Sequence, residues 1–256
     1  MTNPQKPQAK VVTDIRSEGL EFYMVLQYVA YFYKDVMKAQ ARHDSPDTLI
    51  KYSRDREYPW VLMTSKVRPG QKVLDCGSGY SPLPFIWAKF GSEVHAMDKD
   101  TKVCTGPQFI LSELREKGIR QFLRLSVFDK YYIRRLWQPD FWGPVPPKLL
   151  KTYGVNYYNG DFTKLSYGDG HFDLVTCVSV LEHMTPDDRT RGIKEMARVV
   201  KKGGKFIITY DKFKDDLTDD FIKESGMTPA EIVRFIQPDN LYEEGMPEIV
   251  GICLVK

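Results

Sequence analysis

Hydrophobic positions recur along the first third of the chain at helical spacing. Residues 18–40 carry aromatic and aliphatic side chains every three or four positions and contain no proline, so they predict one long helix. A helix start is predicted near Ser45 and Pro46, and a further helix over residues 60–66. The tyrosines of the long helix are interpreted as core residues rather than as substrate contacts. The polar start of the chain, before residue 18, is predicted to be disordered.

From Gln71 onward, short apolar runs alternate with helical patterns, which is typical of a parallel sheet with crossover helices. The predicted strands are KVLDC (72–76), EVHAMD (93–98), VNYYNGD (155–161), FDLVTCVSV (172–180), KFIITYD (205–211) and EIVGICLVK (248–256), the last with a partner near VRFIQ (233–237). The predicted helices are SPLPFIWAKFG (81–91), GPQFILSELREKG (106–118) and TRGIKEMARVVKKGG (190–204). This alternation assigns the chain to the α/β class.

One segment interrupts the alternation. Residues 118–154 form an insertion that is rich in aromatic residues and arginines and ends in a proline-rich turn. A loop this long and apolar is expected to cover another surface, either as a lid over a site or as a dimer contact. We therefore divide the chain into a helical N-terminal arm or lid, residues 1–66, and a main domain, residues 67–256, which contains the insertion.

Composition narrows the class of protein. Of the 256 residues, 42% are hydrophobic and 28% are charged, which is typical of a soluble globular protein. The net charge of +3 falls short of the basic surface of a duplex binder, so we expect no DNA partner. The four cysteines lie far apart without a CxxC pair, which fits a reducing cytoplasm. No signal peptide and no membrane span are indicated, so a cytoplasmic location is expected.

A glycine-containing turn follows the first predicted strand of the main domain. VLDCGSGYSPLPF, residues 73–85, places Asp75 at the strand end, Gly77 and Gly79 in the turn and Pro82 at the start of the next helix. Glycine lets a ligand lie against the backbone, and a helix N-terminus offers free N–H groups. The third glycine of the dinucleotide fingerprint is absent. A carboxylate before the glycines would repel a pyrophosphate and favour a cationic ligand such as S-adenosylmethionine.

Two further carboxylates end the next predicted strands. Asp98, followed by Lys99, is placed to accept from ribose hydroxyls, and Asp161, beside Phe162, is placed to accept from an adenine amino group. Ligands of open α/β sheets bind outside the carboxyl ends of the strands, so these two acids and Asp75 are expected to line one crevice. The alternative is that both acids are helix caps or turn residues.

Four motifs stand in order along the main domain: VLDCGSGYS, VHAMDKD, NGDFTKLSYGDGHFDLVTCVSVLEHM and ARVVKKGGKFIITYD. Together they resemble the class I S-adenosylmethionine-dependent methyltransferases, of the small-molecule, type 11-like kind. The resemblance implies a Rossmann-like sheet of seven mostly parallel strands with an antiparallel last strand, extended here by the N-terminal helices and the inserted lid. It also implies a transferase that uses S-adenosylmethionine to methylate a small molecule on oxygen or nitrogen.

The resemblance assigns cofactor contacts residue by residue. The assigned residues are Asp75, Cys76, Gly77 and Gly79 around the methionine moiety, Asp98 and Lys99 at the ribose, Asp161 and Phe162 at the adenine, and Val178 and Ser179 at the end of the fourth strand. Ser81 stands where the family has a third glycine, which leaves the geometry of this turn open. Cys76 and Cys177 are interpreted as small buried side chains and not as nucleophiles.

Candidates for the acceptor side follow from the chemistry of methyl transfer. In-line displacement requires an aligned nucleophile, exclusion of water and, for a hydroxyl acceptor, removal of a proton. His183, Tyr210 and Asp211 follow or end the fourth and fifth strands and are the candidate catalytic residues, although a Glu-His pair at this position more often supports the cofactor pocket. His95 is interpreted as a satisfied core residue. No metal is indicated, because DKFKDDLTDD, residues 211–220, is interpreted as a solvated acidic turn.

Three functional hypotheses stay open. The first is an enzyme that acts on a small-molecule acceptor, and a homodimer is compatible with it. The second is an RNA- or protein-modifying methyltransferase, and the third is a non-catalytic cofactor-binding subunit. The second would use a basic cluster made of Arg115, Lys117, Arg120, Arg124, Lys130, Arg134 and Arg135, which can equally be a solvated helix face or a site for a phosphate or carboxylate. DNA-amino methyltransferases carry an NPPY or DPPY motif after the fourth strand. This chain has CVSVLEHM there instead, which argues against that type.

Overall fold

The fold is taken from a computed structural model of the chain. The structure describes residues 7–12, 19–39, 54–79, 81–99, 114, 118–120, 123–124, 147–213, 215–236 and 248–256. Among these residues, no helix is both long enough and apolar enough to cross a membrane. The described residues exclude the predicted helix over residues 106–118 apart from residues 114 and 118, the predicted helix start near Ser45 and most of the insertion.

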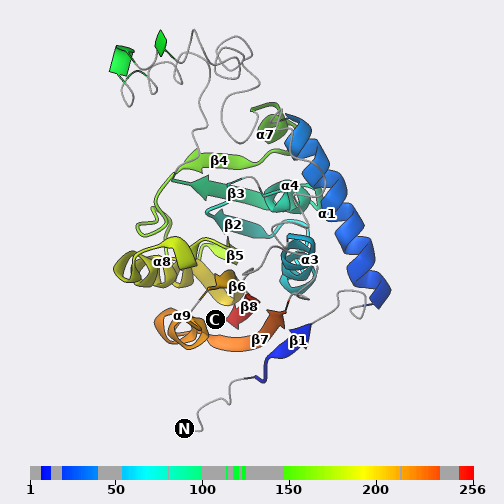
Figure 1. Cartoon of the computed structure of the whole chain (residues 1–256), viewed down its shortest axis with the longest axis vertical. Helices are drawn as coiled ribbons and strands as arrows, with labels where there is room; N and C mark the ends of the chain where they lie inside the picture. Colours follow the sequence, from blue (N-terminus) through cyan, green and yellow to red (C-terminus); the bar gives the residue numbers. More distant parts are fainter. Residues whose placement is uncertain are drawn as a thin grey trace.

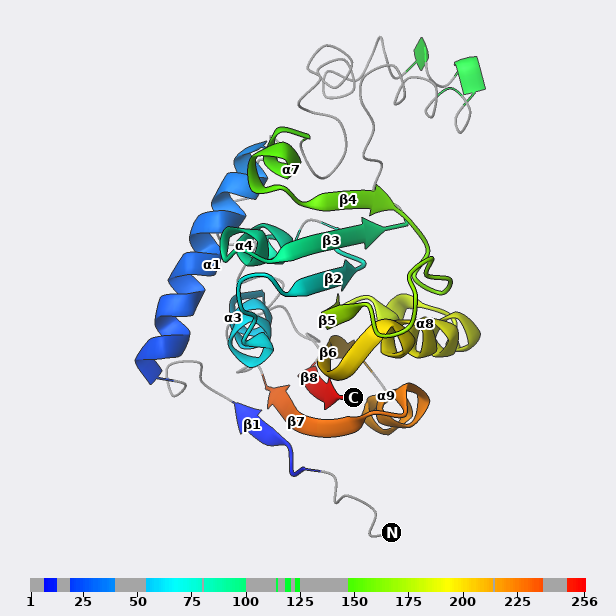
Figure 2. The same cartoon turned by 180° about the vertical axis from the view of Figure 1, so that it is seen from behind.

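Eight strands form one twisted sheet, seen from two sides in Figures 1 and 2. Their spatial order is β1 (Lys10–Val12), β7 (Thr228–Phe235), β8 (Glu248–Val255), β6 (Val200–Lys212), β5 (Phe172–Val178), β2 (Lys72–Cys76), β3 (Glu93–Asp98) and β4 (Asn156–Asn159). The strands from β6 to β4 are parallel to one another, and β8 is antiparallel to both of its neighbours. The expected Rossmann-like sheet with an antiparallel last strand is therefore confirmed.

The N-terminal segment adds one strand, β1, to the seven that were expected. β1 pairs in parallel with β7, with Val11 opposite Arg234. Val12 is buried, and its carbonyl oxygen accepts a hydrogen bond from the Ile236 N–H. The prediction of disorder is wrong for this segment, because an exposed sheet edge lets even a short polar stretch pair its backbone while it buries one apolar side chain.

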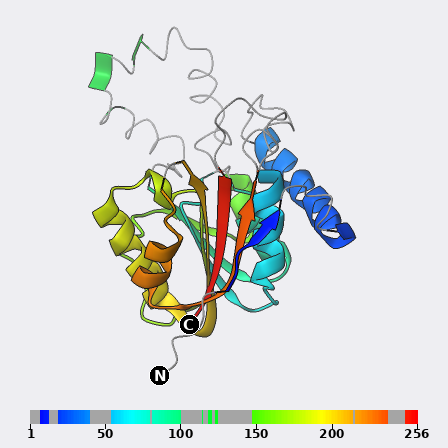
Figure 3. The same ribbon diagram turned by 60° about the horizontal axis from the view of Figure 1, so that its bottom comes forward.

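Helices cover both faces of the sheet (Figure 3). The face on one side carries α1 (Gly19–Ala39), α3 (Arg54–Ser65), α4 (Leu83–Lys89) and α7 (Pro147–Tyr153), and the opposite face carries α8 (Pro186–Val199) and α9 (Thr218–Ser225). Because successive strand residues point to opposite faces, Val73 belongs to the first core and Leu74 to the second. The two cores hold the crossover helices against the sheet and leave the carboxyl ends of the parallel strands at one edge.

Two predicted helix boundaries differ from the structure. α3 begins at Arg54, six positions before the predicted start, and contains Pro59. α8 ends at Val199, and the following Lys201–Gly204 already belongs to β6. An added Cβ at Gly204 would lie 2.9 Å from the carbonyl oxygen of Asp173, so the second glycine allows a close approach between β6 and β5 rather than closing the helix.

The last part of the insertion is integrated into the fold. In α7, the ring of Tyr153 lies 5.8 Å from that of Phe32 on α1 and 5.7 Å from that of Phe85 on α4, measured between centroids. These contacts attach the entry to β4 to the same helical layer as α1. The division of the chain at residue 66 and the role of the remaining insertion stay predictions.

Trp60 fastens α3 to the sheet. Its ring occupies the space above Gly251 of β8, where an added Cβ would come within 2.6 Å of the ring. The indole nitrogen Nε1 donates a hydrogen bond of 3.0 Å to Glu231 of β7, so the polar end of the buried side chain is satisfied. A glycine is needed in the middle of β8 because the indole fills the place of a side chain.

We expect Gly251→Ala to lower the free energy of unfolding by about 1–3 kcal/mol, because the new methyl group would overpack a well-filled core. Urea denaturation followed by circular dichroism measures the change. Gly168→Ala is the matched control, since an added Cβ at Gly168 meets nothing within 4 Å. Equal unfolding midpoints for the two variants would contradict this account of Trp60.

Candidate active site

The glycine turn leaves β2 at its carboxyl end and is tied to β3. The Gly77 N–H donates to the Met97 carbonyl oxygen at 2.9 Å. The Gly79 N–H donates to Asp98 Oδ2, also at 2.9 Å. Both glycines have positive φ, 71° at Gly77 and 45° at Gly79, which other residues adopt only with strain. The hydrogen bond places Asp98 beside the glycine turn, while its predicted contact with a ribose stays a prediction.

Asp75 is enclosed at the end of β2. Its side chain is buried, and the Thr176 hydroxyl of β5 donates a hydrogen bond of 2.6 Å to Oδ1. Burial raises the pKa of Asp75 to about 6, and the hydrogen bond from Thr176 opposes part of that rise. A cation bound near this carboxyl would favour its ionised form, so the position suits a positively charged ligand.

Asp161 has the geometry of a turn residue. Its Oδ1 accepts hydrogen bonds from the backbone N–H and the hydroxyl of Thr163, at 2.9 and 2.7 Å. Its Oδ2 lies 3.4 Å from Nζ of Lys99 in an exposed ion pair. Phe162 is buried against Gly192 of α8, where an added Cβ would lie 2.8 Å from its ring. The structure therefore brings Lys99 and Asp161 together, while their contacts with an adenine or ribose stay predictions.

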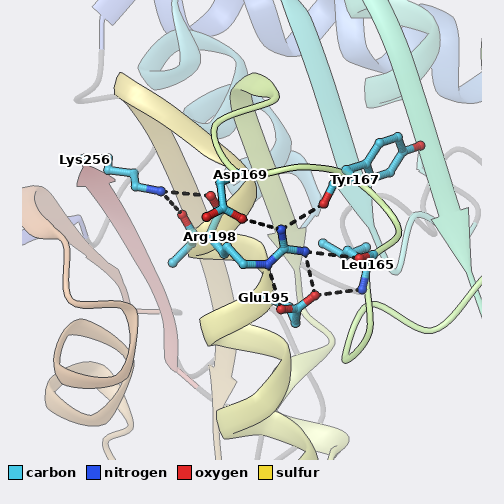
Figure 4. A network of polar contacts seen from close by, with 7 residues as sticks. Leu165, Tyr167, Asp169, Glu195, Arg198 and Lys256 are labelled. Carbon is cyan, nitrogen blue, oxygen red and sulfur yellow. Dashed lines mark hydrogen bonds and ion pairs between the residues drawn. The ribbon is translucent and has the colours of Figure 1, made fainter.

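Arg198 of α8 holds the segment that follows β4 (Figure 4). Its Nε and one terminal nitrogen donate to the Glu195 carboxylate, both at 2.9 Å. Its other donors reach the carbonyl oxygens of Leu165 and Tyr167 at 3.1 and 2.8 Å, and the Asp169 carboxylate at 2.7 Å. A guanidinium can bind several acceptors in fixed directions, so this one side chain sets the path of a segment without regular secondary structure.

Helix α3 brings a buried carboxylate to the ends of β5 and β6. Glu57 is fully buried, and its Oε1 accepts hydrogen bonds from the hydroxyls of Ser179, at 2.7 Å, and of Thr209. Arg54 donates to the other oxygen of Glu57 and, at 2.7 Å, to the Ser179 hydroxyl. The predicted cofactor residue Ser179 is thus bound by side chains that sequence reasoning missed. The sequence signal that could have found them was the charged run RDRE, residues 54–57, which is separated by two residues from the start of the predicted helix over 60–66.

Asp211 and His183, two of the predicted catalytic residues, are brought together through Glu182. Glu182 Oε1 accepts the Asp211 backbone N–H at 3.0 Å and lies 3.9 Å from His183 Nε2. The Glu182 side chain is 3% exposed, whereas that of His183 is 63% exposed. Burial raises the pKa of Glu182 to about 7. Burial, followed by the nearby negative charge of Glu57, also raises the pKa of Asp211.

Tyr210, the third predicted catalytic residue, faces the other side of the sheet. Its hydroxyl donates to Asp216 at 2.8 Å and lies 2.9 Å from the Thr218 hydroxyl. Its ring contacts Phe221 of α9, and burial raises its pKa. Because neighbouring residues of a strand point to opposite faces, Tyr210 is directed away from the side of β6 on which Thr209 meets α3. This placement gives no support to a catalytic role.

The remaining predicted residues near the strand ends are core residues in the structure. Cys76 and Cys177 lie opposite each other on β2 and β5, and burial raises the pKa of both thiols well above the usual range. Neutral buried thiols fit their interpretation as small core side chains. Val178 packs against the core beneath α3 and α4. His95 is satisfied by the Tyr167 hydroxyl at 2.9 Å, as expected.

Of the predicted basic cluster, the structure describes Arg120 and Arg124, and both are exposed. In the acidic turn after β6, Asp216 accepts hydrogen bonds from Tyr210 and Arg234. Within the part of the chain that the structure describes, no group of three or more histidines, cysteines or acidic residues is arranged to hold a metal ion.

Comparison with known sequences locates a methyltransferase segment. Residues 140–208 match a family described as "Methyltransferase domain". The ubiquinone/menaquinone biosynthesis C-methyltransferase UbiE of Laribacter hongkongensis is 29% identical over 153 residues, which cover 58% of this chain and 46% of that protein. The corresponding protein of Shewanella woodyi is 25% identical over 186 residues, covering 69% and 58%. The chain thus spans about half the length of the curated relatives it matches.

A solved structure shows the same fold over the whole chain. The 1,6-didemethyltoxoflavin-N1-methyltransferase of Burkholderia thailandensis, solved with 1,6-didemethyltoxoflavin and S-adenosylhomocysteine, aligns with a TM-score of 0.53 at 16% identity. The alignment covers 100% of this chain and 97% of that one. Residues 140–208 thus match a methyltransferase family, and the chain as a whole has the fold of this solved methyltransferase. The glycine turn, residues 77–79, lies outside residues 140–208, so this family match does not cover it.

Glu182 makes the stability of the methyltransferase domain depend on pH. Folding raises its pKa from about 4.5 to about 7, so the folded state holds this proton more tightly than the unfolded state. Ionising Glu182 therefore costs stability, and the loss develops as the pH rises from about 4.5 to about 7. Glu182→Gln keeps the acceptor for the Asp211 N–H and removes the charge.

We expect the free energy of unfolding of Glu182→Gln, relative to the wild type, to increase by up to about 3 kcal/mol between pH 5 and pH 8. Urea denaturation at each pH gives the free energy of unfolding of the variant and of the wild type. If the variant minus wild-type difference is the same at pH 5 and pH 8, then the pKa of Glu182 is not raised by folding.

Proposed function

We propose that this chain methylates a small molecule and uses S-adenosylmethionine as the methyl donor. The observation that carries the proposal is the hydrogen bond from the Gly79 N–H to Asp98, which joins a left-handed glycine turn to a carboxylate at the end of the next strand. This combination, at the carboxyl edge of a class I sheet, supports a nucleoside-binding site. S-Adenosylmethionine supplies a methyl group activated by a positively charged sulfur.

The charges and the backbone around the turn fit this cofactor. Asp75 and Asp98 offer carboxyl groups to the ammonium and the ribose hydroxyls, respectively. Glycine at position 79 is favoured by its φ of 45° and not by lack of space, since an added Cβ would lie at an ordinary contact distance of 3.7 Å from Asp98 Oδ2. Asp161 and Lys99 lie at the end of the neighbouring strands and extend the same edge towards the adenine.

Asp211 and His183 are proposed to act on the acceptor. Asp211 is partly withdrawn from water beside Glu57, which increases its tendency to hold a proton. His183 is exposed beside Glu182, and its ring lies 6.2 Å from that of Phe213, so it is available to an acceptor that enters from solvent. The acceptor atom is proposed to be an oxygen or nitrogen that carries a removable proton. A carbon acceptor is the alternative favoured by the curated relatives, which are C-methyltransferases.

Binding of S-adenosylhomocysteine tests the cofactor site. We expect isothermal titration to show binding to the wild type and about 10- to 100-fold weaker binding to Asp98→Asn, because a hydrogen bond to a charged group contributes about 1.5–3 kcal/mol. Asp187→Asn, at an exposed aspartate in the first turn of α8, is the matched control and should bind like the wild type. Absence of binding to the wild type would refute the proposal.

Transfer to an acceptor is tested separately. We expect incubation with methyl-labelled S-adenosylmethionine and a cell extract to label a low-molecular-weight product, which mass spectrometry then assigns to an O-, N- or C-methyl group. Label that appears in RNA or protein would instead support the RNA- or protein-modifying alternative. Binding without label in any fraction would favour a non-catalytic cofactor-binding subunit.

A further inference from the structure

The buried carboxylate of Glu57 joins two strands at the edge proposed for the acceptor. β5 and β6 already meet there through their backbones, since the Ser179 N–H donates to the Thr209 carbonyl oxygen at 3.0 Å. The hydroxyls of the same two residues both donate to Glu57 Oε1. Arg54 binds the second carboxylate oxygen, so each oxygen of Glu57 has a partner. One side chain of α3 thereby ties the ends of two adjacent strands.

One of the two residues that Glu57 binds, Ser179, has a strained backbone conformation. Ser179 has a φ of +49°, the left-handed region, which costs a residue other than glycine about 1–3 kcal/mol. The turn at Ser179 leads directly into the short 3₁₀ helix η3, Leu181–His183, which carries Glu182 and His183. The contacts that Glu57 and Arg54 make with the Ser179 hydroxyl hold the chain in this conformation, and so they decide where η3 begins.

The same carboxylate sets the electrostatic surroundings of Asp211. The charged and titratable groups that act on Asp211 are Glu57 and Arg54 from α3, and His183 and Glu182 from η3. Glu57 raises the pKa of Asp211 after burial does, whereas Arg54 and His183 lower it. Glu57 and Asp211 also contribute to the raised pKa of Glu182. Removal of the Glu57 charge should therefore lower the pKa of both carboxyl groups.

We propose that Glu57 is a positioning residue of the acceptor site, which fixes the Ser179 turn and the η3 segment after it, so that Asp211 is placed to receive the proton of an O–H or N–H acceptor. The proposal rests on the proposed function. It makes α3 a structural part of the site rather than a detachable cover, because the strand ends alone leave the hydroxyls of Ser179 and Thr209 without their acceptor. The proton passes from the acceptor atom to a carboxylate oxygen of Asp211 and from there to solvent.

The first experiment requires no acceptor. Carboxyl resonances of Asp211 and Glu182, assigned by substitution in the full chain labelled with ¹³C at aspartate and glutamate carboxyls, are titrated by NMR in the wild type and in Glu57→Gln. We expect both groups to titrate at lower pH in Glu57→Gln, because a negative charge is lost while Arg54 remains. Unchanged titration of both groups would overturn the proposal.

Glu231→Gln is the matched control. Glu231 also ties α3 to the sheet through two side-chain donors, Trp60 Nε1 at 3.0 Å and the Thr64 hydroxyl at 3.3 Å, but it lies on β7. If α3 merely loosens from the sheet, the titration of Asp211 and Glu182 should shift in both variants. If Glu57 itself acts on these two carboxyl groups, the titration should shift in Glu57→Gln alone. A titration shift of the same size in Glu231→Gln would therefore also overturn the proposal.

The second experiment measures methyl transfer to the product labelled in the extract. We expect Glu57→Gln to lower kcat on the order of 10- to 100-fold, to leave S-adenosylhomocysteine binding near the wild-type value and to move the acid limb of the kcat profile to lower pH. Ser179→Gly, which removes the hydroxyl without backbone strain, should lower kcat while the protein stays folded, and it decides the question if Glu57→Gln does not fold. Wild-type kcat in Ser179→Gly would overturn the proposal.

The two experiments separate this proposal from the proposed function. If the wild type fails to bind S-adenosylhomocysteine, the proposed function fails, while the NMR titration still measures the coupling between Glu57 and the two carboxyl groups. If the wild type binds and transfers methyl groups but Glu57→Gln keeps the wild-type kcat and pH profile, the proposed function stands and the positioning role of Glu57 fails.

Discussion

The site depends on the parallel pairing of β5 with β2 on one side and with β6 on the other. Because these strands run in the same direction, their carboxyl ends meet at one edge, with Asp75 opposite Thr176 and Val178 opposite Thr209. Residues more than one hundred positions apart in the chain therefore become neighbours. The backbone register, rather than any individual side chain, brings the glycine turn, the Ser179 turn and Asp211 to the same end of the sheet.

Several acidic residues lie at this edge of the sheet, and burial raises the pKa of some of their carboxyl groups. Asp75 and Glu182 are both buried carboxyls with a raised pKa, about 6 and about 7. Burying a charge is costly unless it is paired, so such groups keep their protons more readily than they would in water. Arg54 balances Glu57 within the same cluster. A bound cation beside such carboxyl groups would favour their ionised form.

The fold and the cofactor edge were largely predictable, because their signals are local. Strand β3 has the predicted bounds, and a glycine turn directly after a strand is a short-range pattern. Asp98 was predicted to end the second strand of the main domain and to share a crevice with Asp75, because the carboxyl ends of parallel strands meet at one edge of the sheet. Tyr210 shows the limit of this reasoning, since its position at a strand end was clear but the face of the sheet to which it points depends on the register and on α9.

The sequence by itself determined the alternation of strands and helices from Lys72 onward, the glycine turn and the position of Asp98 at a strand end, because hydrophobic period and turn chemistry act over a few residues. Only the tertiary structure decided that Glu57 binds Ser179 and Thr209, 122 and 152 positions away, and that Gly251 makes room for Trp60. Such contacts form only after the helices have packed on the sheet. The buried carboxylate of Glu57 is stable there because two hydroxyls and an arginine bind it, and these partners cannot be read from the residues next to it in the sequence.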